Sequence, residues 1–389
     1  MRRMTSTIDA LPDPVAAATQ PDPYPGYARW RAAPPLVFDP RCGLWVASRA
    51  EVVATLLAQP QLRVRPVAEP MPRSLEGSSA GAVFARLVRM DDGPSHARHK
   101  PALQRLLSAL TPTVLRDAAH QAVRGMPSMP LDDALFALPL AALAGALGID
   151  PAASAAVARE GRAFATGLSP LATAQQRQGA STAADALRER LGRQVAAAAE
   201  GSALAAARSF PAVEREVLVA NLIGLFLQTC DATAGLVGLG VLALARAPGS
   251  IARLRSEPAA LAEFVAEVAR HDAPIQNTRR FVGAPCRVHG VDLAEGDTVL
   301  LLLAAANRDA ALNAAPDDFR IARTDRRTLG FGHGAHACPG QAAALSIAAA
   351  SLAALLDDGL DPPAVAAAGW RFHASLNARV PQFHSGDSR

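Results

Sequence analysis

The chain has 389 residues, half of them apolar, with 39 basic and 35 acidic side chains. This composition indicates a globular protein with a sizeable core, and the net charge of +4 is too small to favour nucleic-acid binding. Arginine supplies nearly all of the basic charge, since Lys100 is the only lysine, and the sequence contains no Lys/Arg-rich run.

The cysteines and the N-terminal segment indicate the compartment. The four cysteines are far apart and form no CxxC pair, which in a chain of this size favours a reducing compartment. Residues 1–20 lack the apolar run of a signal peptide and are expected to form a flexible segment. The longest apolar stretch, 217–245, has polar interruptions and predicts a buried helix. We expect a soluble, cytoplasmic protein that contacts no membrane.

Alanine and leucine recur at helical spacing along most of the chain, and strand-like segments are few. Helices are predicted at 47–59, 96–110, 132–147, 152–166, 172–200, 211–246, 250–256, 257–270 and 340–357. Strands are expected at 43–48, 286–293 and 297–305. Irregular excursions are expected at 62–92 and 306–331. The fold class predicted is mainly α with small β-sheets, in a single domain over residues 1–389.

The stretch "FGHGAHACPG", residues 331–340, places a thiol in a loop with little side-chain bulk. Pro339 suits the first position of the apolar helix that follows, so Cys338 is expected at a helix N-terminus, where the dipole favours a thiolate. Three glycines permit a tight turn and close approach of a flat ligand. Such a thiolate could be a nucleophile, a zinc ligand, a haem ligand or a structural cysteine, although the neighbouring histidines are too cramped for zinc.

This stretch resembles the haem-binding loop of the cytochromes P450, F-G-x-G-x-H-x-C-x-G, at every fixed position. The resemblance implies the cytochrome P450 fold and a haem b cofactor, iron protoporphyrin IX, with Cys338 as the axial thiolate on the iron. It also assigns Phe331, Gly332 and Gly340 to the walls of the haem site. His336 becomes a candidate partner of a haem carboxylate.

The resemblance extends over nearly the whole chain. "EVAR", residues 267–270, is similar to the family's E-x-x-R, and Arg280 lies where the family places an arginine on a haem propionate. "DGPSHARHK", residues 92–100, is similar to the helix that reaches the other propionate, which implies roles for His96 and Lys100. These cations fit the chemistry, because burying the two haem carboxylates is costly unless cations pair with them.

Two positions depart from the family pattern. Lys100 replaces the usual arginine and cannot form a two-pronged bond, and the following Pro101 biases it away from helical geometry. We therefore expect that His96 and Lys100 need not share a helix face. Pro339 has no N–H to point at the sulfur, which implies a more electron-rich thiolate and a lower potential.

The segment "LFLQTCDATAGLVG", residues 225–238, is similar to the family's oxygen-side helix. Asp231 occupies the acid position, Ala232 replaces the usual threonine alcohol, and Thr233 remains as the second threonine. Gln228 lies one turn before Ala232 on the same face. Gln228 could replace the lost hydrogen bond, the substrate could organise proton delivery, the enzyme could run an atypical reaction, or water could suffice.

The substrate site is expected to be apolar. Leu227, Pro274 and Ile275 are predicted to line it, Gly224 to leave room in it, and Gln228 and Asn277 to orient the substrate. Residues 62–92 and the region near 165–175 are expected to form its lid. The predicted substrate is a small apolar organic molecule.

The predicted activity is monooxygenation with dioxygen at haem iron. No flavin or iron–sulfur segment is recognised, so electrons are expected from a ferredoxin or flavodoxin with its reductase, which a monomer would receive on a basic face. The arginines proposed for that face are Arg98, Arg105, Arg323, Arg326 and Arg327. A peroxygenase or oxidative-coupling enzyme and a haem-based gas sensor or carrier remain the alternatives.

Overall fold

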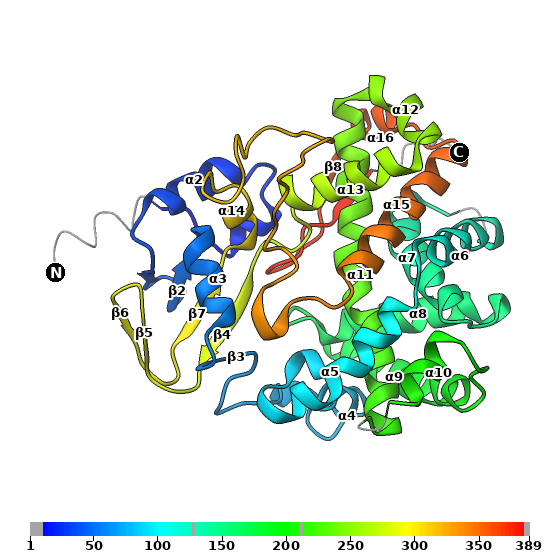
Figure 1. Cartoon of the computed structure of the whole chain (residues 1–389), viewed down its shortest axis with the longest axis horizontal. Helices are drawn as coiled ribbons and strands as arrows, with labels where there is room; N and C mark the ends of the chain where they lie inside the picture. Colours follow the sequence, from blue (N-terminus) through cyan, green and yellow to red (C-terminus); the bar gives the residue numbers. More distant parts are fainter. Residues whose placement is uncertain (1–10, 127–128, 211–212, 385–389) are drawn as a thin grey trace. The chain divides into compact units, whose positions relative to one another are not determined.

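The computed structural model describes residues 11–126, 129–210 and 213–384 (Figure 1). The chain divides into two compact units. The first, called the sheet unit here, comprises residues 1–70, 263–338 and 370–382. The second, the helical unit, comprises residues 71–262, 339–369 and 383–389.

The sheet unit is built on a five-stranded sheet with the strand order β1-β2-β7-β4-β3. β2 and β7 are parallel, and the other neighbours are antiparallel. Two-stranded ladders join β5 to β6 and β8 to β9. The strands are β1 (Val37–Asp39), β2 (Leu44–Ala47), β3 (Leu62–Arg63), β4 (Thr278–Val282), β5 (Cys286–Val288), β6 (Val291–Leu293), β7 (Thr298–Leu301), β8 (Trp370–Phe372) and β9 (Pro381–Phe383).

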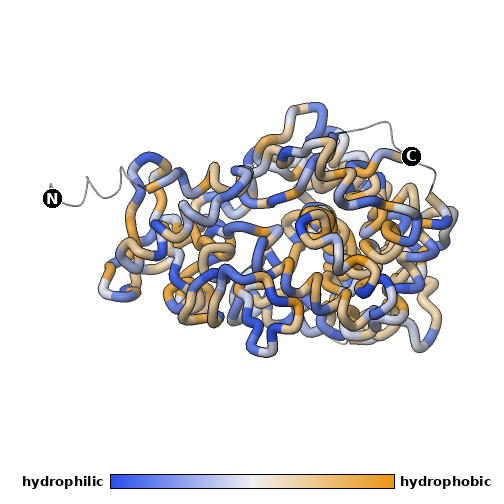
Figure 2. The backbone as a smooth tube through the Cα atoms, turned by 90° about the horizontal axis from the view of Figure 1, so that it is seen from above, coloured by the Kyte–Doolittle hydropathy of each residue, from blue (hydrophilic) through white to orange (hydrophobic). Residues whose placement is uncertain are grey.

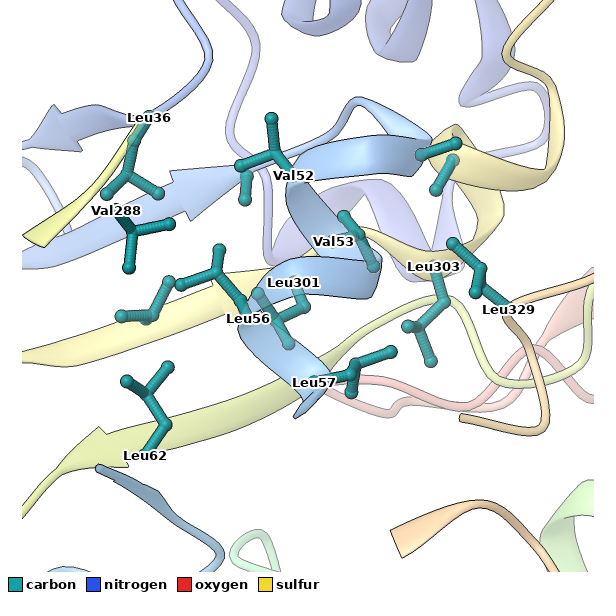
Figure 3. Packing of buried hydrophobic residues seen from close by; sticks show 14 of the residues in the cluster. Leu36, Val52, Val53, Leu56, Leu57, Leu62, Val288, Leu301, Leu303 and Leu329 are labelled. Carbon is teal, nitrogen blue, oxygen red and sulfur yellow. The ribbon is translucent and has the colours of Figure 1, made fainter. Parts of the chain in front are cut away.

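The core of the sheet unit forms where α3 (Ala50–Ala58) packs on this sheet (Figure 3). Val52, Val53, Leu56 and Leu57 occupy one face of α3, as expected of an amphipathic helix with its apolar stripe turned to the core. Leu329 belongs to the same cluster and is buried. The segment that leads into the glycine-rich loop is thus anchored in the hydrophobic core.

The helical unit surrounds α11 (Arg215–Arg246), which is buried along most of its 32 residues. In Figure 1, α11 runs through the middle of this unit, and α7, α8, α9 and α15 pack against it. The other helices of the unit are α4 (Ser79–Phe84), α5 (Gly93–Ser108), α6 (Pro112–Gly125), α7 (Leu131–Ala146), α8 (Pro151–Leu168), α9 (Ala174–Ala196), α10 (Ala203–Arg208), α12 (Ile251–Ser256), α15 (Gln341–Asp357) and α16 (Pro362–Ala367).

Three helices contribute to the sheet unit besides α3: α2 (Tyr24–Ala32), α14 (Leu303–Asn307) and most of α13 (Pro258–His271). Among the described residues, the segments 215–246 and 334–357 are long and apolar enough to cross a membrane. Their most apolar windows are 67% and 56% buried in the fold, as in core helices of soluble proteins. Figure 2 shows hydrophobic and hydrophilic residues interleaved along the backbone.

The predicted fold class is confirmed, and each predicted helix has a counterpart. Four expectations need correction. The segment 297–305 is a strand only over Thr298–Leu301, since α14 begins at Leu303. The segment 286–293 is a hairpin rather than one strand, because the chain reverses at His289 and Gly290, both at positive φ. The excursion 62–92 contains β3 and α4. Residues 11–20 are packed, with Leu11 and Ala18 buried, whereas residues 1–10 lie outside the described part of the chain.

A partly buried polar cluster ties α2 to the C-terminal end of α13 within the sheet unit. The Tyr24 hydroxyl donates to Asp272 at 2.8 Å, and the Arg308 guanidinium lies 3.7 Å from the centre of the Tyr24 ring. Arg308 also donates to Nδ1 of His271 at 3.0 Å, while His271 Nε2 lies 3.0 Å from the Asp317 carbonyl. This pattern requires a neutral imidazole with its proton on Nε2.

Burial and the neighbouring Arg308 charge lower the pKa of His271 from 6.5 to about 4. The unfolded chain therefore binds the proton first, and the free energy of unfolding should fall as the pH drops from about 6.5 to about 4. His271→Gln keeps an acceptor and a donor but does not titrate, so it should flatten this part of a chemical-denaturation pH profile.

The matched control is His289→Asn. His289 is exposed, and its φ of 47° is one that asparagine tolerates. Denaturation midpoints of this variant should follow the wild-type pH dependence. Equal slopes for wild type and His271→Gln between pH 4 and 6.5 would show that His271 does not govern the effect.

Candidate functional site

The glycine-rich loop closes on itself through backbone hydrogen bonds. The Gly332 N–H donates to the Leu329 carbonyl at 2.9 Å, and the Cys338 N–H donates to the Phe331 carbonyl at 2.8 Å. Leu329 is held in the core of the sheet unit, whereas Cys338 is exposed. The loop thus presents a thiol from a backbone that is fixed at its base.

Glycine is required at two positions of this loop. Gly332 and Gly334 have φ values of +74° and +68°, which side-chain-bearing residues rarely adopt. A Cβ at Gly334 would also lie 3.0 Å from the Cα of Ala58 at the end of α3. The loop therefore packs directly on α3, and its path depends on the missing side chains.

The helix after the loop starts later than predicted. α15 begins at Gln341 with Gly340 as its N-cap, and the Gly340 carbonyl accepts from the Ala344 N–H at 2.8 Å. Pro339 precedes the helix, so the expectation that it occupies the first helical position is wrong. Cys338 lies two residues before the N-cap, where the helix dipole acts more weakly than within the first turn.

A buried ion network fixes the chain segment before the loop. Glu267 and Arg270 are both fully buried on α13, one turn apart, and Arg270 binds both carboxylate oxygens, at 2.7 and 3.0 Å. Arg323 and Arg326 donate to the same carboxylate, at 3.3 and 3.0 Å, and so does the Arg320 N–H, at 3.0 Å. Three guanidiniums therefore converge on one carboxylate.

The same arginines also bind backbone carbonyls of the irregular segment. Arg270 donates to the Pro316 carbonyl at 2.7 Å, and Arg323 donates to the Ala314 carbonyl at 2.6 Å. Further along, the side-chain carbonyl of Asn307 accepts from the Leu329 N–H at 2.7 Å. Side-chain hydrogen bonds thus hold the backbone of this segment, which has little regular secondary structure.

The network corrects the docking surface predicted from the sequence. Arg323 is buried and Arg326 is mostly buried, and both are paired with Glu267, so neither is available to a protein partner. Arg98, Arg105 and Arg327 are exposed. Sequence reasoning missed the roles of Arg323 and Arg326, since nothing local distinguishes a buried arginine from a surface one.

Arg280 lies on β4, whose alternating side chains separate it from Arg279. Arg280 is buried and donates to the Arg279 carbonyl at 3.0 Å, whereas Arg279 is half-buried. His336, in the loop of the same unit, is also half-buried. A buried guanidinium suits pairing with an anionic ligand group.

In the helical unit, His96 and Lys100 lie one turn apart on α5, which continues through Pro101. The expectation that Pro101 would take Lys100 out of helical geometry is therefore wrong, and the two side chains share a face. His96 is buried and Lys100 is half-buried. The side chain of His99 is also buried, and its Nε2 has no hydrogen-bond partner among the described residues.

Of the four α11 residues predicted for oxygen chemistry, one differs from the others in its burial. Gln228 and Asp231 are exposed, Ala232 is half-buried, and Thr233 is buried. The Thr233 hydroxyl has no hydrogen-bond partner within the described ranges, and this burial separates it from the other three. Gln228 donates from Nε2 to the Gly224 carbonyl at 2.8 Å, so one N–H of its amide is occupied by its own helix.

The space predicted beside Gly224 is occupied by protein. A Cβ at Gly224 would lie 2.7 Å from Cδ2 of the buried Leu87, so this glycine permits close packing rather than leaving an opening. Asn277 is buried and donates to the Leu376 carbonyl at 3.0 Å, which makes it a backbone anchor. Pro274 is buried, whereas Leu227 and Ile275 are partly exposed.

Comparison with known proteins shows a similarity to the cytochromes P450. The family model described as "Cytochrome P450" matches residues 211–358, which include the Glu267–Arg270 pair and the thiol loop. A monooxygenase of Streptomyces fradiae, named 20-oxo-5-O-mycaminosyltylactone 23-monooxygenase, is 29% identical over 89% of this chain and 82% of its own length. These matches support the resemblance to the cytochromes P450 that the thiol loop indicates.

Other similarities to cytochromes P450 are more local or concern the fold. "Cytochrome P450-terp" of a Pseudomonas species is 38% identical over 28% of this chain. The match spans only 26% of that relative, and the match to a biotin-biosynthesis cytochrome P450 of Bacillus subtilis spans 29%. The crystal structure of CalO2 has a TM-score of 0.77 at 23% identity and covers 96% of this chain and 97% of that one, which shows the fold.

The central role of Glu267 in the buried ion network is testable. Burial alone raises the pKa of Glu267, but hydrogen bonds from Arg270, the Arg320 N–H and Arg326 hold it below its ordinary value of 4.5. The carboxylate therefore stabilises the fold above that pH, and this contribution is lost as the pH falls through the lower folded-state pKa. Glu267→Gln should lower the free energy of unfolding at neutral pH by about 3–5 kcal/mol.

Glu263→Gln is the matched control, since Glu263 lies one turn earlier on α13 with a 56% exposed side chain that pairs with Arg326. Its cost should be about 0–1 kcal/mol. Chemical denaturation of both variants at several pH values measures the difference. Similar losses in the two variants, or an unchanged acid slope in Glu267→Gln, would contradict the role given to Glu267.

Proposed function

We propose that this protein is a cytochrome P450 and a haem-thiolate monooxygenase that oxidises an apolar small molecule with dioxygen and electrons from a redox partner. The observation that carries the proposal is the exposed Cys338 thiol at the end of a glycine loop whose base is fixed in the core. A thiolate presented in this way suits a soft metal centre in a flat ligand.

The residues present fit haem b, iron protoporphyrin IX. Cys338 would hold the iron through its sulfur, with Phe331, Gly332 and Gly340 shaping the loop around it. Gly332 takes a φ of +74°, and a Cβ there would lie 3.2 Å from the His336 carbonyl oxygen, so the loop is a cradle that a side chain would disturb. When bound, the haem supplies the redox chemistry that activates dioxygen.

The cations of each unit match the two carboxylates of this cofactor. In the sheet unit, Arg280 and His336 would bind one carboxylate, supported by the burial of the guanidinium. In the helical unit, His96 and Lys100 would bind the other, supported by their position one turn apart on α5. Lys100 would act as a point charge, because an ammonium cannot grip a carboxylate with two parallel bonds.

The oxygen-side residues of α11 would have different roles in proton delivery. Asp231 is an exposed acid on α11 that can hold and release a proton, while Ala232 contributes no hydroxyl. Gln228 would supply the missing polar contact through its amide oxygen and its second N–H, because Gly224 occupies the first. The burial of Thr233 argues against the direct role that the sequence suggested.

An atypical reaction is the second candidate function. The observation that favours it is Ala232 at the position of the usual alcohol, together with a Gln228 amide that is partly committed to Gly224. Such a site would use peroxide directly or couple substrate radicals. Product formation with hydrogen peroxide alone, compared with product formation from dioxygen and an electron-supplying partner, distinguishes the two functions.

The partners follow from the monooxygenase proposal. A ferredoxin or flavodoxin with its reductase would supply electrons to a cytoplasmic monomer, with Arg98, Arg105 and Arg327 as exposed cations suited to acidic partners. Relatives named as a mycaminosyltylactone monooxygenase and a 6-deoxyerythronolide B hydroxylase support a small organic substrate. Leu227, Pro274 and Ile275 are the apolar residues proposed to contact it.

Replacement of Gln228 tests the proton-delivery role. Gln228→Ala should lower the product formed per electron consumed by about tenfold, which corresponds to about 1.4 kcal/mol, with the lost electrons appearing as hydrogen peroxide. Product, reductant and peroxide are measured together in one turnover assay. Gln178→Ala, at an exposed glutamine of α9, should behave as wild type. Unchanged coupling in Gln228→Ala would exclude the role proposed for this amide.

A further inference from the structure

A cavity of about 480 Å³ lies within the helical unit, between α4, α9 and the first turns of α11. Its inner wall is apolar and includes the buried Val83, Val219 and Ala220. Arginines and carboxylates of the same three segments form its rim. A site with a charged rim and an apolar wall suits a ligand with one charged end.

The rim carries three arginines and three carboxylates, but they do not all pair with one another. Arg86 pairs with Glu216 at 3.1 Å, and Arg188 pairs with Asp185 at 3.8 Å. The remaining rim carboxylate, Glu189, pairs with an arginine that is not on the rim.

Arg215 differs from the other rim arginines. Its guanidinium donates to the Gly192 carbonyl at 2.9 Å and pairs with no carboxylate in the described part of the chain. Arg215 is therefore the rim cation best able to bind an anion. A carboxylate would suit it, because arginine donors pair with carboxylates through charge-assisted hydrogen bonds.

The inner wall continues along one face of α11 toward Gln228. Ala220, Gly224 and Gln228 follow one another at intervals of four residues, so they share a face. Eight residues of helix separate Ala220 from Gln228, a rise of about 12 Å. Small residues thus occupy this face of α11 between the cavity and the amide proposed to act on the oxygen side.

Leu87 packs on this face at Gly224. Its Cδ2 lies 2.7 Å from the position of a Cβ on Gly224, and the residue is fully buried. The backbone on both sides of Leu87 is held by the buried Asn221 of α11. The Asn221 amide accepts from the Val88 N–H at 2.9 Å and donates to the Arg86 carbonyl at 2.9 Å. The backbone is therefore pinned, so Leu87 can move without breaking these hydrogen bonds only through its side chain.

We propose that this cavity binds the carboxylate end of an elongated apolar substrate and that Leu87 is a plug between the cavity and Gln228. The inference rests on the proposed monooxygenase function for the oxidation itself. Arg215 binds the carboxylate, and the apolar chain lies along Ala220 and Gly224 when Leu87 rotates. The substrate class is an aliphatic carboxylic acid at least about 12 Å long in its extended form.

The first test measures the charge contact with the holoenzyme. Dodecanoate and the uncharged 1-dodecanol are titrated by calorimetry into wild type, Arg215→Ala and the control Arg159→Ala. Arg159 is exposed on α8 and lies outside the cavity lining. Arg215→Ala should weaken dodecanoate binding by about tenfold or more, as expected for a charged hydrogen bond, and leave dodecanol unchanged. Equal effects on both ligands, or none, would overturn the carboxylate assignment.

The second test measures the plug. Leu87→Ala should accelerate dodecanoate association in stopped-flow mixing, and adding Gly224→Ala should slow it again, because the new methyl group occupies the vacated space. Leu87→Val removes less buried volume and serves if the alanine variant does not fold. Association rates that are the same in all these variants would show that Leu87 is not a plug.

The two tests separate this inference from the proposed function. Calorimetric binding of dodecanoate does not require turnover, so a dependence on Arg215 in a protein that oxidises nothing would contradict the proposed function alone. Conversely, an active monooxygenase whose dodecanoate affinity and association rate are insensitive to Arg215 and Leu87 would contradict only the inference drawn from the cavity.

Discussion

The convergence of three guanidiniums on the Glu267 carboxylate is the constraint on which the rest of the sheet unit depends. The segment 306–331 contains little regular secondary structure, so its backbone groups need partners from elsewhere. Arg270 and Arg323 supply them while both pair with Glu267. The cost of burying several charges is offset because each has a partner and nearly every donor is used. These ion pairs and hydrogen bonds therefore fix the position of the segment that leads to Leu329.

The position of the thiol loop is set by this segment and by contacts of the loop itself. Leu329 joins the core packed on α3, and two glycines in left-handed conformations allow the backbone to pass close to the end of that helix. The result is an exposed Cys338 on a rigid base. Rigidity of this kind suits a metal ligand, because the direction of the sulfur is set before any ligand is bound. The proposed haem-thiolate function is supported by this geometry together with the similarity to the cytochromes P450.

The sequence predicted the parts of the site that depend on local patterns. The thiol loop has a dense motif, and most helices have regular alanine and leucine spacing. It failed where tertiary context decides. The space beside Gly224 is filled by Leu87, which lies 137 positions earlier in the sequence. Arg326 was predicted to be an exposed cation, but it pairs with the buried Glu267 of α13, which is distant from it in the sequence. The helix α6 was not predicted from the sequence, because polar residues outnumber those of its apolar face, which includes Leu115 and Ala119.

The most direct measurement is the absorbance difference spectrum of the reduced protein with and without carbon monoxide. If Cys338 ligates haem iron as a thiolate, wild type shows a band at about 450 nm, the position that this ligation gives, and Cys338→His shifts the band to the shorter wavelength of a nitrogen-bound haem. A wild-type band that does not respond to Cys338→His, or purified protein that binds no porphyrin when haem is supplied, would contradict the account.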